Sequence, residues 1–217
     1  MKVLITGGTG FLGKSLTQHL NNLEYEVYSV GSKYWDLRSQ HVCDTLLTQV
    51  APDVIVHAAG SVGGIGANQD NPGKFMYDNL IMGANMIELS RQHEIDKFVL
   101  LGTVCAYPKH TPVPFTEDEL WNGYPEETNA PYGIAKKALM KLLETYKEQY
   151  DMNSACLIPV NMYGPHDHFN LTTSHVIPAL ILKFYNAMKN GERSVTLWGT
   201  GTVSREFLYA PDCCEAI

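Results

Sequence analysis

The fold is decided by Val3-Leu4-Ile5-Thr6-Gly7-Gly8-Thr9-Gly10-Phe11-Leu12-Gly13, a stretch close to the start of the chain. Its apolar residues predict a buried strand, its glycines a tight turn, and the residues from Gly10 onward a helix. Gly7 and Gly10 let backbone amides approach a pyrophosphate, while Gly13 lets the helix sit close to the sheet. Residues 7–13 therefore predict a dinucleotide-binding turn; a tight turn without a ligand is the alternative.

Beyond this turn, short β-rich runs alternate with longer amphipathic stretches. The expected strands are 3–5, 26–30, 54–57, 98–101 and 155–160, and the expected helices are 10–22, 39–50, 72–92 and 130–150. Each connection is long enough for a crossover between parallel strands. The alternation predicts an α/β fold with a doubly wound parallel sheet of the Rossmann type.

The character of the sequence changes after Pro159, where Gly-Pro, His and Asn clusters appear. A further helix is expected at 175–190, with two short strands at 194–198 and 205–209. We expect a dinucleotide-binding domain over 1–158 and a smaller, apparently truncated substrate lobe over 159–217, with a strand or helix returning to the first domain. Because 210–217 starts a helix and holds only one or two turns, we expect the sequence to be a fragment.

Composition excludes several classes of function. The 217 residues are 45% hydrophobic and 18% charged, which is enough apolar material for a folded core. The formal net charge of −7 leaves no basic stripe, so nucleic acid is not an expected partner. No stretch is long and apolar enough to span a membrane, and the five cysteines lack a CxxC spacing. We therefore expect a cytoplasmic protein with reduced thiols and no membrane partner.

The second strand ends in Val30-Gly31-Ser32-Lys33, without the acidic residue that would hold an adenine-ribose 2′-hydroxyl. A small polar residue and a cation at Ser32 and Lys33 suit a 2′-phosphate better, which favours NADP (NADPH) over NAD. A solvated turn is the alternative. Asp36-Leu37 follows and offers a carboxylate to the adenine amino group; a plain surface acid explains Asp36 equally well.

Tyr132 and Lys136 stand four residues apart, on one face of a predicted helix. A phenol titrates near pH ~10, so it exchanges protons at neutral pH only with a cation nearby, which Lys136 and an oxidised nicotinamide would supply. Thr103 follows the strand at 98–101, and its hydroxyl can bond the same carbonyl oxygen as Tyr132. With the glycine turn, these residues predict a carbonyl-reducing site.

Together, the glycine turn, the Tyr132–Lys136 pair and Thr103 resemble the extended short-chain dehydrogenase/reductase family. Further motifs are similar to those of members that act on GDP-linked 4-keto-6-deoxy sugars. These motifs are Ser61–Asn68, Gly102–Pro108, Asn129–Tyr132, Asn161–Asp167, Ser174–Leu180 and Trp198–Gly201, followed by Arg205-Glu206-Phe207. The resemblance covers essentially the whole chain.

The resemblance implies 3,5-epimerisation of the sugar followed by NADPH-dependent reduction at C4. It makes Cys105 and His175 the base and acid of the epimerisation, and Tyr132, assisted by Lys136 and Thr103, the proton donor of the reduction. Beyond residues 7–13, 32, 33, 36 and 37, it assigns to the cofactor Leu101, Gly102, Thr103, Val104, Lys136, Pro159, Val160, Asn161, Met162 and His175. It assigns to the GDP-sugar Lys183, Trp198 and Arg205.

These assignments have alternatives. Cys105 could be a small core residue, His175 a polar neighbour of a helix cap, and Trp198 ordinary core. Asn79 resembles the family's asparagine near the nicotinamide, and a plain helix residue is the alternative. His166-Asp167-His168 invites a metal site, but positions two apart in a loop have no scaffold to fix them, so no metal is expected.

The resemblance further implies a homodimer through the helices at 72–92 and 130–150. Many relatives carry serine where this chain has Thr103, which keeps the hydroxyl but is stiffer at χ1. Two other functions stay open: a nucleotide-sugar enzyme that performs only the epimerisation or only the reduction, and a catalytically silent dinucleotide-binding module.

Overall fold

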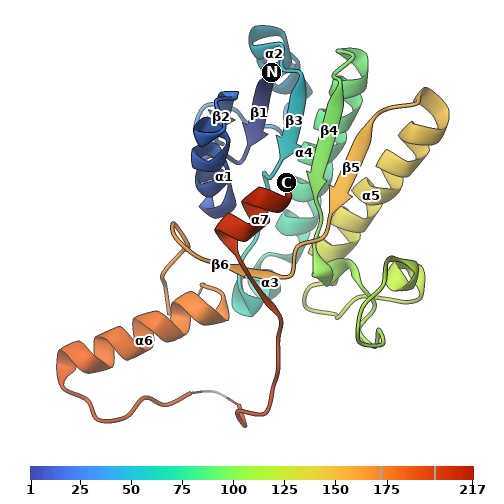
Figure 1. The fold of residues 1–217 in the computed structure, drawn as a ribbon. Coiled ribbons are helices and arrows are strands. Elements are labelled where there is room, and N and C mark those ends of the chain that lie inside the picture. The colour runs from blue at the N-terminus through green and yellow to red at the C-terminus, as the bar shows by residue number, and fades with distance from the viewer. Residues whose placement is uncertain (172, 198) are drawn as a thin grey trace.

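The computed structural model describes residues 1–171, 173–197 and 199–217. Its centre is a sheet of five parallel strands in the order β2-β1-β3-β4-β5 (Figure 1). The strands are β1 (Lys2–Thr6), β2 (Glu26–Val30), β3 (Val54–His57), β4 (Lys97–Leu101) and β5 (Ser154–Leu157). β1 lies between β2 and β3, so the direction of winding reverses there, as in other doubly wound sheets. The expected fold class is confirmed.

Helices cover both faces of this sheet. They are α1 (Phe11–Asn22) and α7 (Ala210–Ala216) on one face, and α2 (Gln40–Val50), α4 (Pro72–Gln92) and α5 (Ala130–Tyr150) on the other. Side chains alternate along β1: Leu4 joins the core under α2, α4 and α5, whereas Val3 and Ile5 join the core under α1 and α7. Because both faces are covered at the centre of the sheet, β1, β3 and β4 contain continuous apolar runs, whereas the edge strand β2 contains Glu26 and Ser29.

Local sequence sets the ends of the helices. The Ser39 hydroxyl accepts a hydrogen bond from the Val42 amide at 3.4 Å and caps α2. Pro72 and Pro131 stand in the first turns of α4 and α5, where an amide proton has no partner inside the helix. After α5 the backbone turns left-handed at Asp151, with φ 52°, which ends the helix.

The chain after β5 departs from the sequence expectation. β5 ends at Leu157 rather than at residue 160, since Pro159 has no amide proton to give to the ladder. A short strand that the sequence does not predict, β6 (Asn161–Tyr163), follows. It pairs in parallel with β7 (Phe207–Tyr209), which falls inside the expected strand 205–209.

The expected strand at 194–198 is wrong over residues 194–197, which form no strand. Among the described residues the second sheet consists of β6 and β7 alone, and residues 194–197 pair with neither strand. Residue 198 lies outside the described residues. The helix expected at 175–190 is confirmed as α6 (Val176–Asn190), and an additional short helix, α3 (Ile65–Asp70), follows β3.

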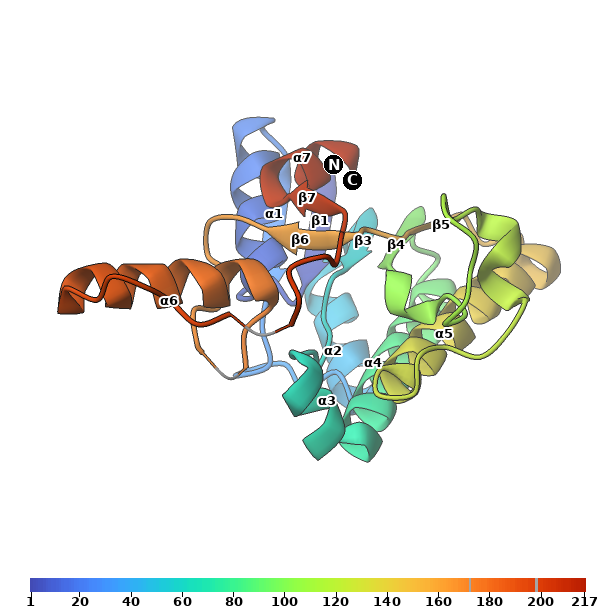
Figure 2. The same cartoon turned by 90° about the horizontal axis from the view of Figure 1, so that it is seen from below.

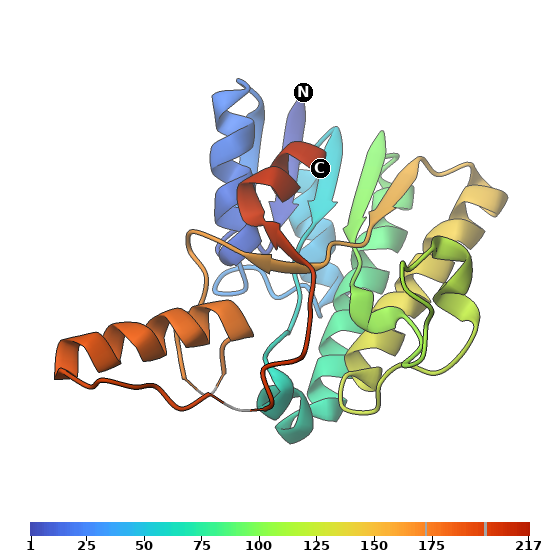
Figure 3. The ribbon, with the colours of Figure 1, turned by 60° about the horizontal axis from the view of Figure 1, so that its bottom comes forward.

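α3 and α6 lie beyond the carboxyl ends of the strands, and α6 stands apart from the sheet (Figures 2 and 3). The chain then returns to the sheet, where Ala210, Cys213 and Cys214 of α7 enter the same core as Leu16 of α1. The boundary between a dinucleotide domain at 1–158 and a substrate lobe after it stays a prediction.

Candidate active site

The glycine turn joins β1 to α1 in a geometry that larger residues could not adopt. Gly7 has φ +72°, and a Cβ there would lie 2.7 Å from the Ala59 backbone nitrogen and Cα. A Cβ on Gly13 would lie 2.2 Å from the carbonyl oxygen of Gly7, so the helix approaches the turn closely. No side chain caps α1 at Gly10. The first backbone amides of α1 are therefore left to a ligand or solvent, which fits a phosphate.

The carboxylate expected near the adenine is already engaged. Asp36 forms an ion pair with Arg38 at 2.8 Å, and hydrogen bonds from Arg38 lower the pKa of the Asp36 carboxyl to about 2. Arg38 also reaches Asp78 at 3.4 Å. Ser32 is exposed, and the Lys33 ammonium lies 5.0 Å from the ring centroid of Tyr34. The loop after β2 thus presents a hydroxyl and a cation to solvent.

Thr103, Cys105 and Tyr132 lie together where β4 ends and α5 begins. The short 3₁₀ helix Val104–Ala106 starts at Thr103, whose hydroxyl accepts a hydrogen bond from the Cys105 amide at 3.2 Å. A Cβ on Gly133 would lie 2.2 Å from the Cys105 carbonyl oxygen, so glycine lets α5 approach this turn. The structure therefore brings together three of the residues that the sequence singled out.

Burial controls the acidity of these groups. Burial raises the pKa of the Cys105 thiol; a hydrogen bond with Thr103 opposes this, and the negative charge of Glu126 adds to it. Burial also raises the pKa of the Tyr132 phenol, helped by Cys105, whereas a hydrogen bond with Thr103 lowers it. Both side chains are consequently in their neutral, proton-carrying forms at neutral pH in this structure.

Lys136 follows Tyr132 by one turn of α5, with only 3% of its surface exposed. Its ammonium group donates a hydrogen bond to the Leu101 carbonyl oxygen at 3.0 Å. Burial lowers the pKa of Lys136 to about 8. The sequence analysis predicts that the Lys136 ammonium lies beside the Tyr132 phenol. In this structure the ammonium is instead hydrogen-bonded to Leu101, the last residue of β4.

His57 is a residue of the site that the sequence reasoning missed. It ends β3, is fully buried, and its Nδ1 lies 2.9 Å from the Thr6 hydroxyl. Burial, with the charge of Lys136 as a second cause, lowers its pKa to about 3. The one available signal was a histidine at the carboxyl end of an otherwise apolar strand.

Side-chain amides fix the loop that follows β3. Asn79 bonds both backbone groups of Ser61, donating to the oxygen at 2.8 Å and accepting from the nitrogen at 3.2 Å. Asn68 donates to the Asn129 side-chain oxygen at 2.9 Å, and Asn129 donates to Glu126 at 3.0 Å. The loop is thus tied to the residues just before Tyr132. For Asn79, the structure shows this bracing of the loop.

The remaining predicted residues lie on the segment after β5. His175 is the residue before α6 and is exposed, while the neighbouring Thr173 carbonyl accepts a hydrogen bond from the Gly64 amide at 3.3 Å. The Lys183 ammonium donates to the Thr196 carbonyl at 3.5 Å, and Arg205 donates to the Ser204 carbonyl at 2.7 Å. Trp198 falls outside the described residues. Among the described residues, the side-chain hydrogen bond of Arg205 is made within its own segment rather than to Thr103, Cys105 or Tyr132.

The predicted cofactor segment 159–162 crosses the carboxyl ends of the strands. Met162 packs into the core under α1 and α7, and the Asn161 side chain donates to the Glu206 carbonyl at 3.1 Å. Pro159 and Val160 are half-buried. The segment is therefore held between the sheet and the residues that lead into β7.

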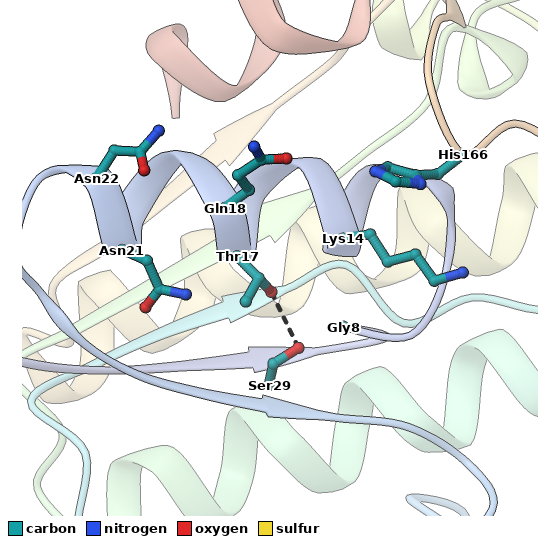
Figure 4. A pocket seen from close by; sticks show the side chains of 8 residues that line it. All are labelled: Gly8, Lys14, Thr17, Gln18, Asn21, Asn22, Ser29 and His166. Atoms are coloured by element: carbon teal, nitrogen blue, oxygen red, sulfur yellow. Dashed lines mark hydrogen bonds between the residues drawn. The ribbon is translucent and has the colours of Figure 1, made fainter.

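A separate polar pocket of about 510 Å³ lies along the outer side of α1 (Figure 4). Its lining residues are Gly8, Lys14, Thr17, Gln18, Asn21, Asn22, Ser29 and His166. Thr17 bridges the helix to β2 through a hydrogen bond to Ser29 at 2.9 Å. The pocket reaches the glycine turn through Gly8.

Residues 1–171, 173–197 and 199–217 hold no group of three or more His, Cys, Asp or Glu side chains placed to bind a metal ion. Within these ranges, no helix combines the length and the hydropathy that crossing a membrane would demand.

Comparison with known proteins gives consistent matches. The model of the NAD dependent epimerase/dehydratase family matches residues 3–217. A GDP-L-fucose synthase of Sinorhizobium fredii is 39% identical over 216 residues, which is 100% of this chain and 69% of that protein. A GDP-L-colitose synthase of Yersinia pseudotuberculosis is 39% identical over 218 residues, which is 100% of this chain and 71% of that protein.

Solved structures agree with these matches. A GDP-L-fucose synthetase from Naegleria fowleri, bound to NADP, superimposes with a TM-score of 0.92 at 31% identity and covers 99% of this chain and 71% of its own. A UDP-glucose 4-epimerase from Thermus thermophilus in complex with NAD gives a TM-score of 0.81 at 24% identity over 100% of this chain and 73% of its own, a likeness of fold alone.

Proposed function

Because the chain belongs to the NAD dependent epimerase/dehydratase family, we propose that it converts GDP-4-keto-6-deoxy-D-mannose to GDP-L-fucose. The reaction is a 3,5-epimerisation followed by an NADPH-dependent reduction at C4. The observation that carries this proposal is the cluster at the start of α5, where the Cys105 thiol and the hydroxyls of Thr103 and Tyr132 lie together, with the buried amine of Lys136 one helical turn further along α5. Curated GDP-L-fucose synthases at 37–39% identity support the same chemistry.

The residues around the glycine turn fit NADP. The uncapped amides at the start of α1 would bind the pyrophosphate, and Ser32 with Lys33 would face the adenine ribose. We further assign to cofactor binding Asp36, Leu37, Leu101, Gly102, Thr103, Val104, Lys136, Pro159, Val160, Asn161, Met162 and His175. When bound, NADPH supplies the hydride for C4.

In the epimerisation, Cys105 and His175 are assigned the two proton transfers at each inverted carbon. Removal of the proton at C3 or C5 breaks the C–H bond; its electron pair forms a double bond to C4, and the π pair of the C4 carbonyl moves onto the oxygen. The hydroxyls of Thr103 and Tyr132 donate hydrogen bonds to this developing oxyanion. Return of a proton from the opposite face then inverts the carbon and restores the ketone.

In the reduction, the same hydroxyls hold the C4 oxygen while C4 accepts a hydride. Tyr132 gives its proton to that oxygen, which completes the alcohol and leaves a phenolate. The buried ammonium of Lys136 offsets the negative charge through the site. One hydroxyl pair therefore serves both half-reactions, which explains how one site can carry two activities.

Three finer assignments belong to the same proposal. Lys183, Trp198 and Arg205 are proposed to hold the GDP-sugar. We propose a homodimer formed through α4 and α5, which light scattering after gel filtration would show as twice the chain mass. A cytoplasmic location fits an enzyme that uses nucleotide-sugar and NADPH pools.

Solvent deuterium incorporation tests the two-step reaction. In D₂O the wild-type protein should introduce deuterium at C3 and C5 of the sugar and oxidise NADPH. Cys105→Ser should slow the incorporation by ~100-fold or more, the order expected for loss of a positioned proton carrier. Cys214→Ser, on α7 at the opposite face of the sheet from α5, is the matched control and should leave it unchanged.

Other outcomes identify the rival functions. Wild-type incorporation in Cys105→Ser would contradict the assigned epimerisation, and NADPH oxidation without any incorporation would indicate a reductase alone. NADPH binding without turnover on a panel of GDP-linked and UDP-linked keto sugars would indicate a silent binding module. The match to a GDP-L-colitose synthase at 39% identity makes a related GDP-sugar the first alternative substrate to assay.

A further inference from the structure

The proposed use of NADPH raises the question of which cation meets the 2′-phosphate of the adenine ribose. Proteins that select NADP usually place an arginine near the end of the second strand for this purpose. The candidate in this chain is Arg38, but it is paired with Asp36 at 2.8 Å and reaches Asp78 at 3.4 Å. Its charge is already neutralised by two carboxylates.

The two other cations near the loop after β2, Lys33 and Lys74, also have partners within the protein. The Lys74 ammonium is paired with Asp78. Lys33 lies over the ring of Tyr34, with its ammonium 5.0 Å from the ring centroid. The loop after β2 therefore offers only a weakly held cation to a phosphate.

Lys14 differs from all of these. It stands in the first turns of α1, is exposed, and lines the polar pocket together with Gly8 and Ser29. Over the described ranges 1–171, 173–197 and 199–217, its ammonium group has no hydrogen bond or ion pair. Figure 4 shows its side chain reaching past Gly8, at the end of the pocket nearest the glycine turn, whereas Asn21 and Asn22 line the other end.

The pocket continues into the predicted cofactor site. Gly8 belongs to the glycine turn, and its amide donates a hydrogen bond to the Val30 carbonyl oxygen at 2.8 Å, next to Gly31 and Ser32. His166 lies at the same end of the pocket as Lys14 and holds a left-handed backbone with φ 69°, which is uncommon for a residue with a side chain. Lys14 thus lines a pocket that reaches the glycine turn through Gly8, and the backbone of Gly8 is bonded to the end of β2.

We propose that Lys14 is the specificity-determining cation for NADPH, binding the 2′-phosphate from the α1 side while Ser32 and Lys33 flank it from the β2 side. This inference rests on the proposed function, since it presupposes NADPH as the cofactor. Lys14 would thus take the role that an arginine usually has, because Arg38 is paired with Asp36 and Asp78.

Binding measurements with paired ligands test this assignment. NADPH and NADH, and the fragments 2′,5′-ADP and ADP, differ by the 2′-phosphate, so each pair isolates its contribution. Lys14→Ala should weaken NADPH and 2′,5′-ADP by ~10-fold, the order expected for one charge-assisted contact. The same variant should change NADH and ADP by less than about twofold, as expected for an exposed substitution. Titration calorimetry on the whole chain gives all four constants.

Two further variants keep the test sharp. Lys14→Arg should retain the preference for NADPH, because it keeps the charge, and Lys189→Ala on the last turn of α6 should have no effect. Equal weakening of NADPH and NADH by Lys14→Ala, or loss of the preference only in Lys33→Ala, would overturn the role of Lys14 and leave the proposed function standing. Failure of the wild-type chain to bind NADPH would overturn both.

Discussion

The start of α5 and the start of α6 carry the two halves of the proposed chemistry, yet they are built differently. Lys136 on α5 is 3% exposed, and Tyr132 sits against Thr103 and Cys105 within a covered site. His175 at the start of α6 is exposed, and several apolar side chains of that helix face solvent. The proton donor for reduction is thus fixed by the core, whereas the second proton carrier for epimerisation lies on a sparsely packed element.

This difference has an energetic cause. The amphipathic α5 packs against α4 and the sheet, so burial both positions its polar groups and moves their pKa values. α6 lies beyond the strand ends, and no other helix or strand of the described residues packs extensively on it. The reduction should therefore tolerate surface changes on α6 better than the epimerisation does, because only the epimerisation uses His175 as a proton carrier.

The largest effect is expected from removing the proton donor at the α5 end. Tyr132→Phe should lower the rate of NADPH oxidation with the keto sugar by about 10²–10⁴-fold, the usual contribution of a positioned general acid. Its folding should be little changed, because the ring that fills the site remains. Stopped-flow or steady-state absorbance at saturating NADPH measures the rate.

A tyrosine on the same helix provides the control for this prediction. Tyr146 bonds Glu88 at 2.8 Å, away from Thr103 and Cys105, so Tyr146→Phe should keep the wild-type rate. Retention of more than about a tenth of the activity in Tyr132→Phe would show that another group protonates the C4 oxygen.

Much of the fold follows from residues close in sequence. Val3-Leu4-Ile5 and Gly7 to Gly13 specify a strand, a turn and a helix by local propensity and steric need, and the structure confirms them. β6 and residues 194–197 could not be predicted, since a three-residue strand exists only through its long-range partner. Pairing between β6 and β7 is decided by tertiary packing rather than by local pattern.

The candidate site divides in the same way. Tyr132, Lys136 and Thr103 are found from spacing because one helix and one strand end carry them. The hydrogen bonds between Thr6 and His57 and between Asn68 and Asn129 join residues that are far apart in the sequence, so their spacing does not predict these contacts. The ion pair between Asp36 and Arg38 also could not be predicted from the sequence, since two charged residues close in the chain can equally both face solvent.

A smaller effect is expected when pH changes the charge of Lys136. Burial lowers its pKa from the ordinary 10.5 to about 8, so the ammonium form predominates below about pH 8 and is lost above it. If the reduction needs this charge, its rate should be constant below pH 8 and fall by about tenfold for each pH unit above. Single-turnover reduction from pH 6 to 10 measures the profile.

The matched variant for this profile is Lys136→Arg. Arginine keeps its charge throughout this range, so the fall above pH 8 should disappear even if the overall rate is lower. A profile that keeps its alkaline fall in Lys136→Arg would assign it to another group. The raised pKa of Tyr132 makes the phenol a poor candidate for that group.

The smallest effect is expected on α6, where Met188 is 72% exposed. Met188→Ala should change the free energy of unfolding by less than ~0.5 kcal/mol, because an exposed side chain loses little burial. Met86 on α4 is fully buried, and Met86→Ala should cost about 2–5 kcal/mol through lost burial and a cavity. Urea unfolding compares the two. A loss of more than ~1 kcal/mol in the free energy of unfolding of Met188→Ala would show that this face of α6 is covered in solution. The packing of α6 would then differ less from that of α5.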